Sequence, residues 1–303
     1  MPRVLHTAQA LVDVILEVDA LPLRGGNVNA RSEQKYAGGA VTTLIAAART
    51  GAEAVHGGAH GTGPNGDLIR EALARDGIAL SDAPRPDADT GYCTVLIEPS
   101  AERTFLTVYG AERDITAASL ATLEPQAGDL VCVSGYSLFE PTREPLLEFL
   151  EALPAGVDVV LDPGDPFADF PEEVQRRVLA CTTVWTSNAD EARALTDLDD
   201  LEDTPQAIRR RLRPGAVVIV RDGDRGCLVF HHGRGTEIPA FPQTPVDTNG
   251  AGDTHTGVLL AERALGADWE SGATRANAAA AIAVTRRGTE SAPTRDEVDA
   301  FLA

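Results

Sequence analysis

Apolar runs typical of β-strands alternate with helical runs along most of this chain. The clearest strand-like runs are residues 129–138 (DLVCVSGYSL), 157–163 (VDVVLDP), 182–188 (TTVWTSN) and 216–223 (AVVIVRDG). Segments with helical periodicity lie between and after them, at 141–153, 171–180, 189–196, 204–212, 251–265, 273–287 and 294–303. Because strands that alternate with helices build parallel sheets, we expect an α/β fold in which helices cover a largely parallel sheet.

Two segments interrupt this rhythm with the period-2 alternation of antiparallel strands. They are residues 19–36 and 90–110, and the second has the hairpin-like sequence EPSAER at its middle. Within a single domain of residues 1–303, we expect a small separate sheet or lid, inserted at about 10–36 and 88–112. Aspartates interrupt the N-terminal stretch MPRVLHTAQALVDVILEVD, which makes it a poor signal peptide, so we expect it to be the first β-strand.

Charge and composition argue against several classes of partner. The chain has 26 Lys and Arg residues against 46 Asp and Glu, a formal net charge of −20 that repels nucleic acids and anionic membranes. No apolar run approaches the roughly 20 residues that a membrane span needs. The four cysteines form no CxxC pair and three lie in strand-like runs, so we expect buried free thiols and a reducing cytoplasm.

The first of two glycine-rich turns is GTGPNG. Gly61, Gly63 and Gly66 have the G-x-G-x-x-G spacing of a dinucleotide-binding turn. Pro64 removes one of the N–H groups that a pyrophosphate needs, and this is not the first strand-to-helix connection. A plain turn is the simpler interpretation.

The second glycine-rich turn lies in VDTNGAGDTHTG, residues 246–257. Gly250, Ala251 and Gly252 have almost no side chain, so their backbone N–H groups can converge on an anion. They precede a helical run, where N–H groups lack intrahelical partners and the helix dipole is positive. The only lysine of the chain is Lys35, far away in sequence, so this is not a Walker A loop. Asp253 is either a helix cap or a general base for an attacking hydroxyl group.

These motifs resemble those of the ribokinase-like (PfkB) family of carbohydrate and nucleoside kinases, along nearly the whole chain. DTNGAGD resembles the C-terminal signature of the family, and GGAVTTLIAAARTGA its N-terminal signature. SNADEA matches the family's N-x-x-E element, and NAAAAIAVTRRG is similar to the segment that closes the adenine and cation sites. The resemblance implies a three-layer α/β sandwich with a small β-sheet lid. It also implies phosphoryl transfer from ATP, with Mg²⁺, to a hydroxyl group of a small sugar.

The resemblance further implies roles for individual residues. Asp253 would be the general base, and the backbone of Gly250, Ala251 and Gly252 would hold the transferring phosphate. Substrate would be bound by Asp13, Gly38, Gly39 and Thr43, and nucleotide by Asn188, Glu191, Gly223, Gly226 and Asn277. Glu191 would also order a water molecule bound to Mg²⁺. Asp247, with backbone carbonyl groups around Asn249, Ala283, Arg286 and Gly288, matches the ribokinase pattern for a monovalent cation such as K⁺.

Several of these residues also have a purely structural interpretation. Asn188 and Glu191 are three residues apart and could cap the helix that starts between them. The glycines of RDGDRG fit a hairpin turn, and Asn277 fits the polar face of an alanine-rich helix. Asp13 is an acid within an apolar strand, where hydrogen bonds to substrate hydroxyl groups would explain it; the alternative is an exposed edge position.

The sequence constrains the identity of the phosphoryl acceptor less tightly. Thr43 stands where the family has a sugar-binding asparagine, and SGY (134–136) stands where many ribokinases have a glutamate. Arg103 and Arg113, in the lid region, could bind a phosphate group of a phosphosugar. A pentose, a ketose, a sugar acid, a phosphosugar and a nucleoside therefore all remain candidates.

Two alternative functions and one assembly follow from the same residues. A nucleoside kinase of this fold would need an aromatic base site, for which the candidates are chiefly Tyr92, Phe105 and Tyr109. A sugar-binding or regulatory protein without catalysis is the alternative from another class. An exposed edge of the lid would invite a homodimer.

Overall fold

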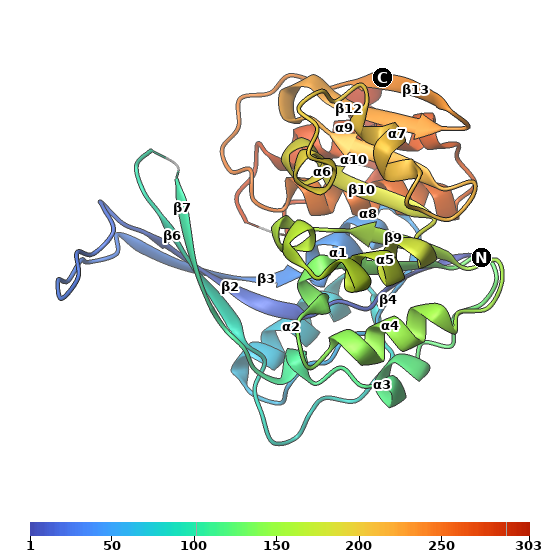
Figure 1. The fold of residues 1–303 in the computed structure, drawn as a ribbon. Coiled ribbons are helices and arrows are strands. Elements are labelled where there is room, and N and C mark those ends of the chain that lie inside the picture. The colour runs from blue at the N-terminus through green and yellow to red at the C-terminus, as the bar shows by residue number, and fades with distance from the viewer. Residues whose placement is uncertain (101, 289) are drawn as a thin grey trace.

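The computed structural model describes residues 1–100, 102–288 and 290–303, which form an α/β body and a smaller sheet that projects from it (Figure 1). Among these residues the central sheet has nine strands, in the order β13-β12-β11-β10-β9-β8-β1-β4-β5. Neighbours from β11 to β5 pair in parallel, and β12 and β13 form an antiparallel edge. The strands are β1 (Arg3–His6), β4 (Glu53–His56), β5 (Ala79–Leu80), β8 (Leu130–Ser134), β9 (Asp158–Asp162), β10 (Val184–Asn188), β11 (Val217–Arg221), β12 (Gly226–His231) and β13 (Arg234–Pro239).

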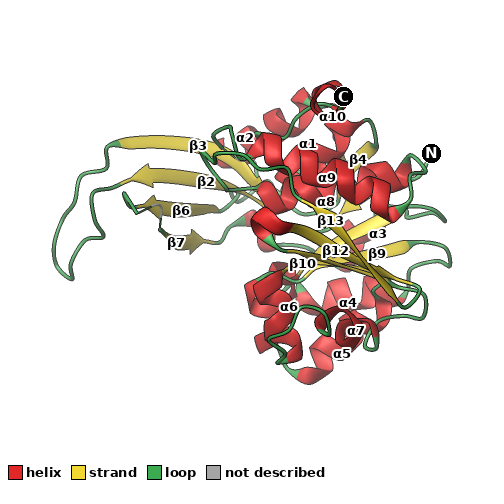
Figure 2. Ribbon diagram, turned by 90° about the horizontal axis from the view of Figure 1, so that it is seen from above, coloured by secondary structure: helices red, strands yellow, loops and turns green. Residues whose placement is uncertain are grey.

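Helices cover both faces of the central sheet, so that it is the middle of three layers (Figure 2). In β11, Val217 and Ile219 belong to the core on one face, and Val218 and Val220 to the core on the other. Burial on both faces explains why this strand is continuously apolar. On the first face lie α1 (Ala40–Thr50), α2 (Pro64–Arg75), α8 (Ala251–Ala264), α9 (Trp269–Ala283) and α10 (Arg295–Leu302); on the second lie α3 (Ala117–Ala121), α4 (Arg143–Glu151), α5 (Glu172–Cys181), α6 (Ala189–Thr196) and α7 (Thr204–Arg209).

The smaller sheet, called the lid below, consists of β2 (Ala10–Glu17), β3 (Ser32–Gly39), β6 (Tyr92–Ile97) and β7 (Arg103–Val108). Its strand order is β3-β2-β6-β7, with antiparallel outer pairs and a parallel pair of β2 and β6 at the centre. The predicted hairpin at EPSAER joins β6 to β7, and Ala101 within it lies outside the described residues. The α/β fold with a mostly parallel sheet, two helical layers and a small second sheet is therefore confirmed.

Two of the expected strand positions are wrong. The N-terminal stretch is not one strand but two, since β1 lies in the central sheet and β2 in the lid. Between them, Thr7 donates from both N–H and Oγ1 to the carbonyl of Cys132 in β8, which keeps residue 7 in the body while residue 10 begins the lid. Residues 18–31 form no strand, so only the second part of the segment 19–36 pairs, as β3.

The strand predicted at 129–138 is also too long. It ends at Ser134 and continues as a 3₁₀ turn, Gly135–Leu138. A Cβ atom at position 135 would lie 1.7 Å from the carbonyl oxygen of Pro163, so only glycine allows the close approach at which the chain turns. Apolar content alone does not mark this end, because Leu138 is buried like the strand residues before it.

The GTGPNG turn is a helix start that the chain itself satisfies. Gly63 precedes α2, and the N–H groups of Asn65 and Gly66 donate to the Asp89 carboxylate at 3.1 and 2.9 Å. A carboxylate of the protein thus takes the anion position, which supports the plain-turn interpretation.

Two further expectations concern the cysteines and membrane-spanning segments. The four cysteines are free thiols, of which Cys93, Cys132 and Cys227 are buried and Cys181 is partly exposed. None of the helices among the described residues is both long and apolar enough to cross a membrane.

Candidate active site

The parallel strands bring polar side chains to one edge of the central sheet. β9, β10 and β11 end at Asp162, Asn188 and Arg221, and Asn188 pairs directly with Arg221 in the register. Ser134, at the end of β8, pairs with Asp162. In open α/β sheets ligands bind at the carboxyl edge, so a ligand site is expected at this edge.

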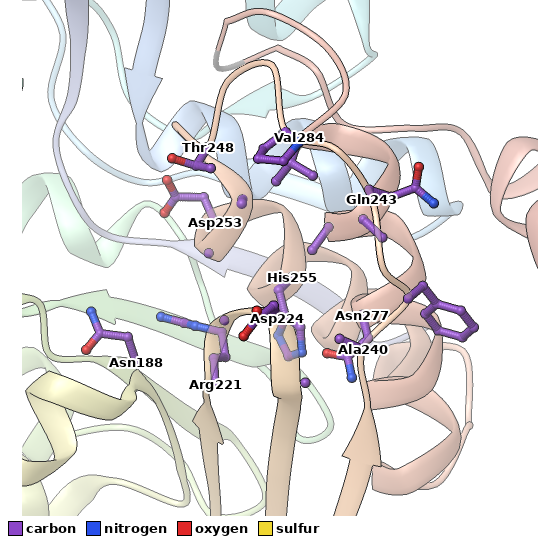
Figure 3. A pocket seen from close by; sticks show the side chains of 18 of the residues that line it. Asn188, Arg221, Asp224, Ala240, Gln243, Thr248, Asp253, His255, Asn277 and Val284 are labelled. Atoms are coloured by element: carbon purple, nitrogen blue, oxygen red, sulfur yellow. The ribbon is translucent and has the colours of Figure 1, made fainter. Parts of the chain in front are cut away.

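Two cavities lie at this edge. The large cavity, of about 780 Å³, is bounded by the ends of β10 and β11, the turn before β12, and helices α8 and α9 (Figure 3). The lid cavity, of about 470 Å³, lies between the lid and the body. Tyr136, Asp162 and Asp253 line both cavities. The two cavities therefore meet at these three side chains, which form the junction between them.

The N-terminus of α8 points at the junction. Gly250 precedes the helix with φ 74°, a left-handed conformation that glycine adopts without strain. The first hydrogen bond of the helix runs from the Thr254 N–H to the Gly250 carbonyl, at 2.8 Å. The N–H groups of Gly252 and Asp253 have no partner among the described residues and lie at the positive end of the helix dipole. Ala251 and Gly252 line the large cavity, so the predicted anion site faces it.

Asp253 is a carboxylate with an unusual environment. Burial raises its pKa to about 6, and the charge of Asp162 adds to the shift, whereas Arg221 and a hydrogen bond with Thr43 oppose it. An acid in this range is ionised at neutral pH, yet is a stronger base than an exposed aspartate. This combination is the one that general-base catalysis requires.

Arg221 is a candidate functional residue that was not predicted from the sequence. Its Nη1 donates to Thr186 Oγ1 and Thr256 Oγ1, both at 2.8 Å, and its Nη2 lies 3.3 Å from Asp162 Oδ2. A Cβ atom at Gly252 would lie 3.5 Å from the same Nη2, so the guanidinium group is beside the helix start. The sequence feature that could have identified Arg221 is its place at the end of a buried strand, where a charged side chain needs a partner or a ligand.

The predicted substrate residues gather around the lid cavity. Asp13, Gly39 and Thr43 line this cavity, and Gly38 packs against the Asp13 carboxylate. A Cβ atom at Gly38 would approach Asp13 Oδ2 to 2.4 Å, and one at Gly39, where φ is 62°, would approach the Gln9 carbonyl to 2.6 Å. The paired glycines thus let the lid strands and the Asp13 carboxylate pack without clashes. Burial raises the pKa of Asp13 to about 7, and the charge of Asp253 adds to this shift.

Asn188 and Glu191 serve as a helix cap and also line the large cavity. Asn188 Oδ1 accepts the Glu191 N–H at 2.8 Å, and Glu191 Oε2 accepts the Asn188 N–H at 2.9 Å. The structural interpretation of this pair is therefore correct, and Glu191 Oε1 has no hydrogen-bond partner among the described residues. Burial and the charge of Asp162 raise the pKa of Glu191 to about 7.

The other predicted nucleotide residues, Gly223, Gly226 and Asn277, also line the large cavity, and Asn277 lies at its opposite end from Asn188 (Figure 3). Gly223 and Gly226 flank the turn between β11 and β12, which is the hairpin expected from sequence. Asn277 Nδ2 donates to the carbonyl groups of Ile238 and Pro239 at 3.0 and 3.1 Å, so it anchors β13 as well as lining the cavity. His255 is buried there, and burial lowers its pKa to about 3.

Two residues of the predicted cation site, Asn249 and Gly288, contact Asp247, and they do so through N–H groups where carbonyl groups were expected. Asp247 Oδ1 accepts the Asn249 N–H at 3.0 Å, and its Oδ2 accepts the Gly288 N–H at 3.1 Å. The Ala283 carbonyl, at the end of α9, accepts the Arg286 N–H at 2.9 Å. Segments separated in sequence are thus joined at one carboxylate.

The two lid-region arginines have partners of their own. Arg113 donates to the carbonyl groups of Tyr136 and Glu140, and it lies over the Tyr109 ring at 4.9 Å. Arg103 donates to Asp247 Oδ1. Neither lines the lid cavity, so the structure gives no support to the idea that they bind a phosphosugar.

Asp162 and His6 were also not predicted from the sequence. Asp162 ends β9 at the junction, and His6 ends β1 at the lid cavity. Burial lowers the pKa of His6 to about 3, with a further contribution from His56, so its ring is neutral. Both residues end apolar strands on the ligand-binding edge, which is the pattern that would have identified them.

The sequence matches one family of known proteins along nearly its whole length. The family model described as pfkB family carbohydrate kinase matches residues 1–295. An uncharacterized sugar kinase of Escherichia coli (strain K12), YegV, is 34% identical over 298 residues, which cover 97% of this chain and 92% of that protein. The ATP-dependent ribose-1-phosphate kinase of Halopiger xanaduensis is 31% identical over 316 residues, with 100% and 98% of the two chains covered.

Solved structures show the same fold. Arabidopsis thaliana ribokinase complexed with ribose and ATP superimposes with a TM-score of 0.82 at 24% identity, covering 99% of this chain and 98% of that one. The agreement extends over body and lid alike, because almost the whole of both chains is covered. With the family model matching nearly every residue, this chain belongs to the pfkB family of carbohydrate kinases.

Proposed function

We propose that this chain transfers the terminal phosphoryl group of ATP to a hydroxyl group of a small, uncharged sugar. One observation carries the proposal: Asp253 lies at the junction of the large cavity and the lid cavity. A carboxylate there can contact an acceptor hydroxyl group in the lid cavity and face a phosphoryl group in the large cavity.

The roles of the chain's own residues follow from this placement. Asp253 takes the proton of the acceptor hydroxyl group as the oxygen attacks phosphorus. The backbone turn of Gly250, Ala251 and Gly252, whose open donors among the described residues are the N–H groups of Gly252 and Asp253, stabilises the charge on the phosphoryl oxygens together with Arg221. Asp13 accepts hydrogen bonds from other hydroxyl groups of the sugar, with Gly38, Gly39 and Thr43 shaping its surroundings. The two reactants are thereby held in one orientation, which removes an entropic part of the barrier.

The nucleotide is assigned to the large cavity. Its base would lie near Asn277 and the turn of Gly223 and Gly226, and its phosphates would point towards Asn188 and Arg221. Mg²⁺ bound to those phosphates would neutralise part of their charge. Glu191 suits the role of ordering a water molecule on that ion, since its Oε2 is used by the helix cap and its Oε1 is not.

The lining of the lid cavity favours a neutral acceptor. Four carboxylates line it, from Asp13, Asp162, Asp165 and Asp253, and no lysine or arginine among the described residues does so. His6 adds no positive charge, because burial keeps its ring neutral. A phosphosugar or a sugar acid would enter a negatively charged cavity without a cationic partner, whereas sugar hydroxyl groups are good donors to carboxylates.

A nucleoside is the second candidate acceptor. Phe105 and Tyr109 line the lid cavity and could stack on a base, although Tyr92 does not line it. An acceptor panel separates these possibilities: neutral pentoses and hexoses, ribose 1-phosphate, fructose phosphates, 2-keto-3-deoxygluconate and nucleosides, scored by ADP release. We expect turnover with a neutral sugar. Turnover with phosphosugars alone would contradict the proposed acceptor class.

Asp253→Asn tests the chemistry and the non-catalytic alternative together. Loss of the base should lower kcat by about 10²–10⁴-fold while nucleotide affinity stays unchanged. Gly235→Ala is a suitable control, because Gly235 is exposed on β13 outside both cavities. Equal turnover of Asp253→Asn and wild type would remove Asp253 from its role. A wild type that binds sugar and never releases ADP would instead support a regulatory protein.

The location and the assembly are also proposals. Free cysteines, three of them buried, suit the reducing cytoplasm. The lid offers a homodimer surface, since β7 is an edge strand on which Phe105 and Leu106 are 60% and 66% exposed.

A further inference from the structure

One ion pair connects the lid to the loop that leads into α8. Arg103, the first residue of the edge strand β7, donates from Nη2 to Asp247 Oδ1 at 3.0 Å and to Thr248 Oγ1 at 3.2 Å. The two charged partners are 144 residues apart in sequence. Their side chains are only 24% and 13% exposed, so water screens the pair less than it would at the open surface.

The same strand also forms part of the lid cavity. Side chains alternate along a β-strand, which puts Arg103, Phe105 and Thr107 on one face of β7. Phe105 and Thr107 line the lid cavity, and Arg103 extends the row towards Asp247. The position of the cavity wall is therefore linked to the position of the loop at residues 247–250.

Asp247 in turn controls the shape of that loop. Its carboxylate accepts the N–H groups of Asn249 and Gly288, and its own N–H donates to the Val284 carbonyl at 3.1 Å. The loop continues directly into Gly250 and the first turn of α8. A change in the charge balance at Asp247 would thus move the N–H groups that face the large cavity.

The groups around Asp247 determine whether a monovalent cation could bind there. The family resemblance assigns Asp247 and nearby backbone groups to such an ion. In this protein the Asp247 carboxylate already has a guanidinium group at hydrogen-bond distance and two backbone N–H donors. A further cation beside it would be repelled by the Arg103 guanidinium group. The residues present therefore do not fit a bound K⁺ while the ion pair is formed.

We propose that Arg103 is a positioning residue that latches the lid to the 247–250 loop and supplies, at Asp247, the positive charge that a monovalent cation would otherwise provide. This ion pair closes the lid cavity and at the same time holds the 247–250 loop in position at the start of α8. The effect of the Arg103–Asp247 ion pair on turnover rests on the proposed kinase function. Its effect on cation binding at Asp247 does not.

The first test needs no substrate. Thermal unfolding is followed in KCl and in tetramethylammonium chloride at equal ionic strength, for wild type and for Arg103→Gln. Wild type should unfold at the same temperature in both salts. Arg103→Gln, which exposes the Asp247 carboxylate to K⁺, should gain about 2–4 °C in KCl alone.

The second test uses turnover with whichever acceptor is active. Arg103→Gln should lose about 10–100-fold in kcat in tetramethylammonium and recover part of it in KCl, while Arg103→Lys keeps activity in both salts. Glu17→Gln is the matched control, because it breaks another lid-to-body ion pair, Glu17–Arg287, without altering Asp247. It should leave the response to K⁺ unchanged.

Two results would overturn the proposal. The first is a wild type whose unfolding temperature and kcat rise with K⁺ as much as those of Arg103→Gln. The second is an Arg103→Gln variant that does not respond to K⁺ in either measurement. If no acceptor is phosphorylated at all, the proposed function fails, and the unfolding experiment still decides the charge balance at Asp247.

Discussion

Asp13 on lid strand β2 and Asp253 at the start of α8 line the same cavity, and the charge of Asp253 raises the pKa of Asp13. The two carboxylates approach the acceptor position from the lid and from the body. Burial is the larger cause of both shifts, to about 7 for Asp13 and about 6 for Asp253. Their protonation should therefore govern both catalysis and stability.

The first prediction is a pH dependence of turnover. A base must be deprotonated, so kcat/KM should rise with pH through about 6 to 7 and level off above that range. Because the groups interact, the apparent pKa values belong to the pair. The measurement is a pH–rate profile at constant ionic strength, with Asp253→Asn as the control that should lose the rise. Constant kcat/KM between about pH 5 and 8 would contradict the assignment of the base.

The second prediction concerns stability. The pKa of Asp13 is higher in the folded protein than its ordinary value of 3.8, so the folded state holds this proton more tightly. That stabilisation is present at low pH and is lost as pH rises through about 7. Asp13→Asn, uncharged at every pH, should raise the free energy of unfolding by about 1–3 kcal/mol at pH 8, and by less at pH 5; the range allows for screening at the cavity.

Denaturant unfolding at the two pH values measures this difference. Asp87→Asn, at an exposed position of the body, is the control and should change stability little at either pH. A stability gain that is the same at both pH values would show that the charge of Asp13 is not its cause.

The third prediction concerns Arg221. Arg221→Gln removes the guanidinium group beside Gly252 and leaves Asp162 without its cationic partner. We expect kcat to fall by about 10²–10³-fold, because the charge of the transferring phosphoryl group loses a stabilising partner. Arg225→Gln, an exposed arginine in the adjacent turn, is the matched control. Comparable losses for the two variants would mean that Arg221 acts only through the fold.

The fourth prediction concerns Gly38. A methyl group there would approach Asp13 Oδ2 to 2.4 Å and displace the carboxylate. Gly38→Ala should therefore raise KM for the acceptor by about 10-fold or more and leave KM for ATP unchanged. Gly235→Ala, where the nearest atom is the end of the flexible Leu228 side chain at 3.3 Å, is the control. Steady-state kinetics with each substrate varied in turn measures the two KM values separately. A parallel rise in KM for ATP would argue against a local effect.

The fifth prediction concerns the lid edge. If β7 pairs with a second copy, Leu106→Lys should convert a dimer into a monomer, since a buried lysine at such an edge is costly. Leu23→Lys, in the exposed loop between β2 and β3, should not. Light scattering after gel filtration measures the mass, and a monomeric wild type would disprove the lid interface.

Local features of the fold could be predicted from the sequence because their causes are local. The apolar run of β11 predicts a strand that is buried on both faces, and the small residues before Asp253 predict a helix start with open N–H groups. The spacing of Asn188 and Glu191 predicts the helix cap that the two residues form. Such patterns depend on neighbours within a few positions along the chain.

Strand ends and strand partners depended on more distant segments. The N-terminal apolar stretch is shared between two sheets, and the strand after Leu130 stops where Gly135 meets Pro163. Burial continues beyond both strand ends, as Ala8 and Leu138 show, so a run of buried residues does not mark where the strand stops.

The sequence by itself determined the class of fold, the family and the segment that carries the candidate base. Only the tertiary structure placed Arg221 beside Gly252, Asp162 at the junction of the cavities, and Arg103 against Asp247. The physical reason is that a charged side chain is stabilised by partners at distances of a few ångströms in space. Those partners come from segments up to 144 residues apart, and no local pattern in the chain records which of them will meet.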